Sequence, residues 1–357
     1  MKKSSALLMT AGIAGGALTV AGVGVAYAGW SALARQARKL RGADLSGQVV
    51  LITGGSRGLG LQLAREFAAH GCRIAICARS SEQLEAARAD LRRRGAEPLI
   101  VVCDLTDREQ AEALVGKVTD HFGRVDILVN NAGSIRVGPL DSMRLEDFES
   151  AMAIMFWSNV YTSMAVLPQM RARRGGRIVN VTSIGGKVSI PHLLPYSCAK
   201  FAAVAFSEGL RTEVAKENIK VTTIVPGLMR TGSHLNAEFK GDHGREFLWF
   251  SLGAASPLAS ISAERAARDI VQATRWGLPE RILSAPANVL ARLHGALPEL
   301  TIPILSLVNE YLLPSGSDPE VKKGREAENE VDSRQLRIVN TLGGTAARDL
   351  NESPAGV

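Results

Sequence analysis

The chain has few cysteines and no cluster of metal-binding residues. Its four cysteines form no CxxC pair, and no group of histidines accompanies them. This pattern argues against a zinc site or a disulfide framework, so we expect no bound metal. Free thiols are typical of a reducing compartment. The cysteines are Cys72, Cys77, Cys103 and Cys198.

Aromatic residues are absent from both clusters of basic residues, at 35–41 and 88–94. We therefore interpret the first cluster as membrane-proximal and the second as a solvated helix end, and expect no nucleic-acid partner. The net charge of +7 is modest for 357 residues. The hydrophobic content of 46% and charged content of 22% are those of a globular protein with a full core.

Charged residues are also absent from Ser4 to Ala34. The apolar stretch Ser5–Trp30 has 26 residues, and about 20 suffice for a helix to span a bilayer. Two lysines precede this stretch and four cations follow it, so the positive-inside rule places the main domain in the cytoplasm. We predict a membrane-anchor helix at 1–34 and a basic linker at 35–45.

Two other interpretations of the N-terminal segment stay open. Lys2 and Lys3, an apolar core and "AYA" at 26–28 before Gly29 also fit a cleaved signal peptide. The apolar stretch is long for that, and a buried or peripheral helix is the third possibility. We favour the anchor.

Residues 46–285 alternate between apolar runs and amphipathic segments, and no internal repeat is apparent. The apolar runs lack polar alternation, which is typical of parallel strands covered on both faces. We predict an α/β fold with a doubly wound parallel sheet of about seven strands, the Rossmann fold. The expected strands lie at 49–53, 72–78, 97–104, 125–133, 176–183, 219–227 and 281–284.

The chain changes character after this domain. Residues 286–314 form an apolar extension interrupted by prolines. Residues 315–357 are polar, mixed in charge and rich in small residues, so we expect a largely disordered tail.

A glycine-rich turn, "TGGSRGLG", follows the first predicted strand at 53–60. Thr53, Gly54, Gly58 and Gly60 form the pattern TGxxxGxG. Glycines let the backbone turn tightly and approach a pyrophosphate, which then lies at a helix N-terminus. The turn therefore predicts a nucleotide site.

The stretch "PYSCAK" places Tyr196 one helical turn before Lys200. With the glycine turn, these residues make the chain resemble the short-chain dehydrogenase/reductase family over roughly 46–285. Further markers occur in the family's order: "CDLTD" at 103–107, "NNAG" at 130–133, Ser183, and "PG" at 226–227. The resemblance implies an oxidoreductase that uses a nicotinamide dinucleotide.

The resemblance also implies the catalytic residues. Tyr196 would give or take the proton at the substrate oxygen, and Ser183 would hydrogen-bond that oxygen. A free phenol has a pKa of ~10. The cation of Lys200 would lower this pKa, and Lys200 would also hold the nicotinamide ribose.

The cofactor residues follow in the same way. Asp104 would contact the adenine, and Asn131 with Gly133 would line the central part of the cofactor. The residues predicted to bind the cofactor are Gly54, Ser56, Arg57, Gly58, Leu59, Gly60, Arg79, Asp104, Leu105, Asn131, Ala132, Gly133, Tyr196, Lys200, Pro226, Gly227 and Thr231.

The end of the second strand indicates which dinucleotide binds. An acidic residue there would hold the ribose 2′-hydroxyl and repel a 2′-phosphate. This chain has Ala78 at that position, followed by Arg79, and Arg57 lies in the glycine turn. Guanidinium groups pair with phosphate, so we predict NADP(H).

One residue departs from the family pattern. The family has a fourth catalytic residue, an asparagine 13 residues before the proline of "LP" in the long helix. Here the proline is Pro168, and the position 13 before it is Met155. A thioether is a weak acceptor and no donor. Asn159 lies one turn further on, so the proton relay is in doubt.

The substrate wall is expected from the segments 228–258 and 134–142, and the stretches at 247–260 and 189–196 are apolar. We predict an NADP(H)-dependent oxidoreductase that interconverts a lipophilic carbonyl compound and its alcohol. The alternative is a cofactor-binding scaffold or sensor tethered to a membrane. The resemblance implies a homo-oligomer built through the helices at 145–170 and 195–215.

Overall fold

The computed structural model describes residues 42–256, 260–332 and 347–352. The predicted membrane anchor at 1–34 lies outside these residues, as does most of the basic linker. The described residues from Leu45 onward form one compact unit.

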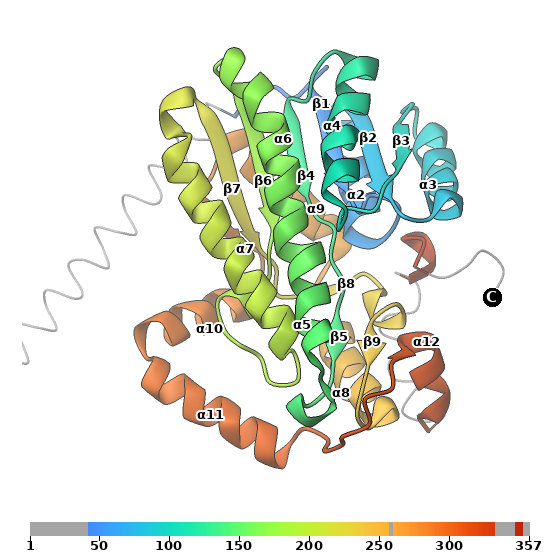
Figure 1. The fold of residues 1–357 in the computed structure, drawn as a ribbon, viewed down its shortest axis with the longest axis vertical. Coiled ribbons are helices and arrows are strands. Elements are labelled where there is room, and N and C mark those ends of the chain that lie inside the picture. The colour runs from blue at the N-terminus through green and yellow to red at the C-terminus, as the bar shows by residue number, and fades with distance from the viewer. Residues whose placement is uncertain (1–41, 257–259, 333–346, 353–357) are drawn as a thin grey trace, which may run out of the picture. The chain divides into compact units, whose positions relative to one another are not determined.

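A seven-stranded sheet is the centre of this unit (Figure 1). Every neighbouring pair is parallel, in the order β11-β7-β6-β4-β1-β2-β3. The order reverses beside β1, so the prediction of a doubly wound α/β fold is confirmed. The strands are β1 (Val49–Thr53), β2 (Arg73–Ala78), β3 (Leu99–Val102), β4 (Ile127–Asn130), β6 (Gly176–Val181), β7 (Ile219–Val225) and β11 (Glu280–Ile282).

Helices cover both faces of the sheet. In Figure 1, α4, α6 and α7 lie in front of the sheet, and α2 and α9 lie behind it, packed against each other. All five residues of β1 are buried, because both of its faces are covered. The helices of the sheet are α2 (Gly58–Ala69), α3 (Ser81–Arg93), α4 (Arg108–Phe122), α5 (Leu145–Met152), α6 (Ser158–Ala172), α7 (Leu194–Glu213) and α9 (Ala263–Trp276).

The capping residues explain where these helices begin and end. The Ser80 side chain accepts a hydrogen bond from the backbone N–H of Gln83 and starts α3. Asp107 does the same for α4, and Gly123, with φ of +87°, ends that helix in the left-handed region.

The long helix predicted near 145–170 is one continuous run with a local change of winding. A π turn, Ala153–Trp157, joins α5 to α6. By length and composition this run could cross a membrane, alone among the described helices. Its Val166, Leu167 and Met170 belong to the hydrophobic core, so core packing accounts for its apolar character.

Smaller elements gather beyond the carboxyl ends of the strands, in the lower half of Figure 1. Two small sheets have the orders β10-β8 and β12-β9-β5. Their strands are β5 (Arg136–Val137), β8 (Leu228–Arg230), β9 (Glu238–Phe239), β10 (Ser260–Ser262) and β12 (Lys322–Lys323). The helix α8 (His243–Ala255) packs against β5, β8 and β9.

The apolar extension forms two helices, α10 (Ala285–Ala296) and α11 (Pro298–Tyr311). The polar tail contains ordered parts where its composition predicts disorder. Its residues 322–327 form β12 and α12 (Gly324–Ala327), and Ala347 and Leu350 are buried. These few apolar side chains supply anchors that an average over the whole tail hides.

Candidate active site

The turn between β1 and α2 holds its glycines in conformations that other residues avoid. Gly54 and Gly58 have φ of +63° and +55°, which costs a residue with a Cβ roughly 1–2 kcal/mol. A Cβ added at Gly60 would lie 2.0 Å from the carbonyl oxygen of Gly54. The turn leads into the N-terminus of α2, whose first turn carries no acidic side chain. Such a helix end favours an anion.

Hydrogen bonds join this turn to the "NNAG" loop after β4. The Thr53 hydroxyl oxygen accepts from the backbone N–H groups of Asn131, at 2.9 Å, and Ala132, at 3.1 Å. The Asn131 side chain donates back to the carbonyl oxygens of Thr53 and Gly54, at 3.1 and 3.2 Å. A Cβ added at Gly133 would lie 3.9 Å from the Lys200 ammonium nitrogen. The loop therefore connects the turn with α7.

A carboxylate from the C-terminal segment lies at the glycine turn. Glu352 is 4% exposed, and its Oε1 lies 2.4 Å from where a Cβ of Gly58 would be. Its Oε2 is 3.6 Å from Nη1 of Arg57. The turn thus accepts an anionic group at the place where a dinucleotide phosphate is expected, so these residues fit such a cofactor. Sequence analysis missed Glu352, because only its spatial position distinguishes it.

The residues predicted near the adenosine end lie in the turn itself, after β2 and after β3. Arg79 is exposed and makes no ion pair within the described part of the chain. The Ser56 hydroxyl donates to Oε1 of Gln83 at 3.4 Å. Asp104 accepts from the backbone N–H and the hydroxyl of Thr106, at 3.0 and 2.8 Å. Its carboxylate therefore also serves as an ordinary turn residue.

The structure brings Ser183, Tyr196 and Lys200 together. Ser183 follows β6 and caps a short 3-10 helix, Ile184–Gly186, by accepting from the Gly185 N–H at 3.0 Å. A Cβ added at Gly185 would lie 3.0 Å from Cε1 of Tyr196 and 3.5 Å from the Ser183 hydroxyl oxygen, so both side chains lie beside Gly185. The Lys200 nitrogen lies 5.7 Å from the centre of the Tyr196 ring. A serine and a tyrosine can thus hold one oxygen atom beside a buried cation.

Burial dominates the protonation of this group. It raises the pKa of the Tyr196 phenol, and the polar Ser183 side chain nearby offsets only part of this effect. Burial also lowers the pKa of Lys200 to about 8. The resemblance implies that Lys200 lowers the pKa of Tyr196, whereas in this structure burial raises it.

Met155, which the family spacing assigns to the relay position, lies beside Gly133. It is 1% exposed, and its Cγ lies 3.4 Å from where a Cβ of Gly133 would be. It packs against Ala199 and Tyr196 in a small apolar cluster. The Asn159 side chain donates to the carbonyl oxygen of Met155 at 3.0 Å, so this amide serves the helix.

The segment after β7 closes the other side of the site. The Ile184 N–H donates to the carbonyl oxygen of Pro226 at 2.7 Å. A Cβ at Gly227 would lie 2.6 Å from the Ser284 hydroxyl oxygen, which explains the glycine. Thr231 is buried, and its hydroxyl accepts from the Ser233 N–H at 3.3 Å.

A small cavity of about 10 Å³ adjoins Tyr196, roughly the space for one water molecule. Its lining is mixed in polarity. Arg136 pairs there with Asp147 and, at 2.5 Å, with Glu238, and Lys240 lies 2.6 Å from Asp147. The lining residues are Ser134, Arg136, Asp147, Ser150, Ala151, Met155, Pro195 and Tyr196.

The apolar segment expected to form the substrate wall packs largely inward. Phe247 and Phe250 of α8 are buried against Phe239 in an apolar cluster that also touches Tyr196. His192, at φ of +62°, places its Nδ1 2.7 Å from Oε1 of the fully buried Glu246. These side chains form a core beneath the site.

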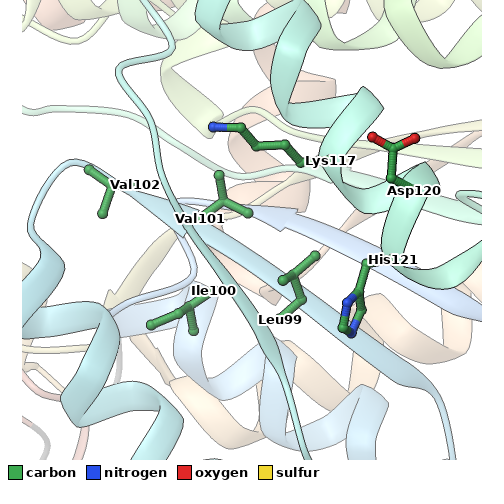
Figure 2. A pocket seen from close by; sticks show the side chains of 7 residues that line it. All are labelled: Leu99, Ile100, Val101, Val102, Lys117, Asp120 and His121. Carbon is green, nitrogen blue, oxygen red and sulfur yellow. The ribbon is translucent and has the colours of Figure 1, made fainter.

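A second hollow, of about 610 Å³, lies away from these residues. Figure 2 shows its walls, formed by strand β3 at the edge of the sheet and by one side of α4. It contains neither the glycine turn nor Tyr196, so we place no chemistry there. Its lining residues are Leu99, Ile100, Val101, Val102, Lys117, Asp120 and His121.

Comparison with known proteins identifies relatives over the sheet domain. A dehydrogenase/reductase SDR family protein 7-like of Anopheles gambiae is 42% identical over 198 residues, which are 54% of this chain and 62% of that protein. A fatty acyl-CoA reductase of Acinetobacter baylyi is 37% identical over 190 residues, covering 53% of this chain and 64% of the reductase. The chain thus spans less than two thirds of these relatives.

Solved structures share the fold. A short-chain dehydrogenase from Streptomyces avermitilis has a TM-score of 0.64 at 28% identity, covering 74% of this chain and 98% of that one. L-sorbose reductase from Gluconobacter frateurii, complexed with NADPH and L-sorbose, has a TM-score of 0.61 at 29% identity. The match covers 68% of this chain and 97% of the reductase. The family profile described as short chain dehydrogenase matches residues 48–240. Because this match spans more than half of the chain, from β1 past Tyr196, the chain belongs to the short-chain dehydrogenase/reductase family of oxidoreductases.

Proposed function

We propose that the chain is an NADP(H)-dependent oxidoreductase that interconverts a lipophilic carbonyl compound and its alcohol. The observation that carries this proposal is the convergence of Ser183, Tyr196 and Lys200 beside the loop that is tied to the glycine turn. A nicotinamide dinucleotide bound on that turn would supply or accept the hydride.

The side chains divide the remaining work. The hydroxyls of Ser183 and Tyr196 hold the substrate oxygen. In the reducing direction the Tyr196 phenol gives its proton to that oxygen and regains one from solvent. Because burial raises the pKa of Tyr196, the phenol keeps its proton at neutral pH, which suits reduction. Lys200, close to the ring, stabilises the phenolate left behind.

The choice of NADP(H) rests on Arg79 and Arg57. Arg79 is exposed, has no ion-pair partner in the described residues, and follows Ala78 at the end of β2. At that strand end Ala78 stands where a carboxylate would repel a 2′-phosphate. The relative whose structure contains NADPH is consistent with this choice.

The proposal of a lipophilic substrate is supported by one relative, which is a fatty acyl-CoA reductase. A membrane anchor at 1–34, with the catalytic domain in the cytoplasm, would place the site near such substrates. We also propose a homo-oligomer, since three large apolar side chains are exposed on the long helices. They are Trp157 of the π turn, Met164 of α6 and Phe201 of α7.

An activity assay tests the proposal directly. The purified protein is incubated with a panel of lipophilic ketones, aldehydes and fatty acyl-CoAs, with NADPH or NADH. We expect oxidation of NADPH with at least one member of the panel. Tyr196→Phe should abolish turnover and keep NADPH binding, because it removes only the proton donor. Full activity in Tyr196→Phe would contradict the mechanism.

The second candidate is a cofactor-binding scaffold or sensor, favoured by Met155 at the relay position. It predicts binding of NADPH without turnover on any panel member. Turnover that depends on Tyr196 would exclude it.

A further inference from the structure

The described part of the C-terminal tail, residues 347–352, is bound along the glycine turn. The carbonyl oxygen of Leu350 accepts the N–H of Gly58 at 2.8 Å. The Asn351 side chain donates to the carbonyl oxygens of Ser56, at 3.0 Å, and Gln83, at 3.3 Å. The tail therefore uses backbone groups of the turn and of the start of α3.

The same segment is held from the opposite side of the site. The Asn236 side chain donates to the backbone oxygen of Glu352 at 3.0 Å and to its Oε2 at 2.6 Å, and Arg325 also donates to that backbone oxygen. A Cβ at Gly232 would lie 2.5 Å from Ala347. The tail thus bridges the glycine turn and the loop after Thr231, the two walls between which the cofactor is predicted to lie.

Two of its contacts are ones that the cofactor needs. The Gly58 N–H at the start of α2 is a group that a pyrophosphate would use, and the tail's Leu350 takes it. Arg57 is predicted to bind the 2′-phosphate, and Glu352 lies 3.6 Å from it. We propose that residues 347–352 are an autoinhibitory segment that competes with NADP(H) for the glycine turn. This proposal rests on the proposed function.

The segment is suited to reversible binding. Leu350 is 0% exposed and Ala347 is 3% exposed, which gives it two apolar anchors. The Glu352 carboxylate loses its hydration, and burial raises its pKa although Arg57, Asn236 and Arg325 act in the opposite direction. Its partners therefore compensate the buried charge only in part, and phosphate groups that carry more charge can displace it.

A binding titration of the full chain tests the competition. The dissociation constant for NADPH is measured by fluorescence for the natural sequence, Glu352→Ala and Leu350→Asp. Releasing a competing segment raises the fraction of open sites, so we expect roughly tenfold tighter binding in either variant. The matched control is Asp349→Ala, which removes a carboxylate from an exposed position in the same segment and should change nothing.

A second measurement follows the segment itself. Hydrogen exchange of the peptide that contains residues 347–352 should become faster when NADPH saturates the full chain, because the cofactor displaces it. Unchanged NADPH affinity in both variants, or slower exchange on adding NADPH, would overturn the competition while leaving the proposed function intact. If no form of the protein binds either dinucleotide, the proposed function fails, and the autoinhibition fails with it.

Discussion

The ammonium nitrogen of Lys200 lies 5.7 Å from the ring centre of Tyr196, although its hydrogen bond goes elsewhere, to the carbonyl oxygen of Val181 at 3.0 Å. Lys200 is 4% exposed and has no carboxylate partner among the described residues. A buried cation without a counter-ion destabilises the folded state. We infer that Lys200 is kept at this position for its role in the reaction, although its buried charge destabilises the folded state.

Lys200→Met should therefore stabilise the protein at neutral pH and abolish turnover. Burial lowers the pKa of Lys200 from its ordinary 10.5 to about 8 in the folded state. Below pH ~8 the folded protein carries the full penalty, about 3 kcal/mol, since each pKa unit is worth 1.36 kcal/mol. As the pH rises from about 8 to about 10.5, the folded lysine releases its proton first, and the natural protein gains stability.

The measurement is the difference in unfolding free energy between Lys200→Met and the natural protein at several pH values. The advantage of methionine should shrink as the pH rises from about 7 to about 9.5. Methionine cannot donate the hydrogen bond that the Val181 carbonyl oxygen accepts from Lys200. This loss reduces the stabilisation expected from Lys200→Met, but it does not change how that stabilisation varies with pH. Lys216→Met, at an exposed lysine, is the control. A difference that stays constant with pH would contradict the buried charge.

Replacing Arg79 and Arg57 with alanine should weaken NADPH binding far more than NADH binding. Each lost charge-assisted hydrogen bond is worth roughly 1.5–3 kcal/mol, which is about ten- to a hundredfold in affinity. Arg79→Ala should show the larger single effect, because Arg57 is already engaged with Glu352. The measurement is the ratio of the two dissociation constants.

Arg108→Ala serves as the control, since Arg108 is 71% exposed and pairs with Glu112 at the start of α4. Equal affinity of the natural protein for NADPH and NADH would refute the predicted cofactor choice.

Met155→Asn should raise turnover by a few-fold to tenfold, because an amide restores a donor and an acceptor beside Gly133 and Lys200. Tenfold corresponds to only ~1.4 kcal/mol of barrier. Cofactor affinity should barely change. An unpaired amide in this apolar slot would cost ~1–3 kcal/mol, so the melting temperature is measured with the rate. A stable variant with unchanged turnover would show that protons take another route.

The N-terminal segment gives a prediction about location. Residues 1–34 should hold the protein in membranes through a carbonate wash, and a protein that begins near Arg35 should be released by the same wash. The apolar stretch of 26 residues is long enough to span the bilayer. Recovery of a mature protein that begins at Gly29 or Trp30 would instead show a cleaved signal peptide.

The strands were predictable because a parallel strand that is buried on both faces is a short run of mostly apolar residues without polar alternation. The run "VVLIT" at β1 is apolar up to its last residue, Thr53, and glycine follows it. β3 (LIVV), β4 (ILVN) and β7 (IKVTTIV) are also rich in β-branched and aliphatic residues. The π turn at Ala153–Trp157 was not predictable, since a single widened turn leaves the apolar periodicity of α5 and α6 nearly unchanged.

The proximity of Tyr196 and Lys200 was predictable from their spacing, and the electrostatics around them were not. Tyr196 and Lys200 are four residues apart, so a helix must bring them together. The balance between burial and charge depends on surrounding side chains such as Met155, which come from other elements. The contacts of the tail with the glycine turn were not predictable for a related reason. Leu350 and Glu352 contact Gly58, almost 300 positions earlier in the sequence, and no local pattern indicates such a contact.

Gly58 and Gly60 of the turn are glycines for different reasons. At Gly60 an added methyl group would meet the backbone oxygen of Gly54 at 2.0 Å, so any larger residue disturbs the fold whatever is bound. At Gly58 the methyl group would instead meet Glu352, a side chain from a segment that can leave. In a mutational scan scored by folded protein alone, Gly60 should be intolerant, and Gly58 should tolerate alanine at the modest cost of its positive φ. If the variants are scored by cofactor binding instead, substitutions at both glycines should be harmful. A position that is sensitive only in the binding scan, as we expect for Gly58, is therefore required by the cofactor and not by the fold.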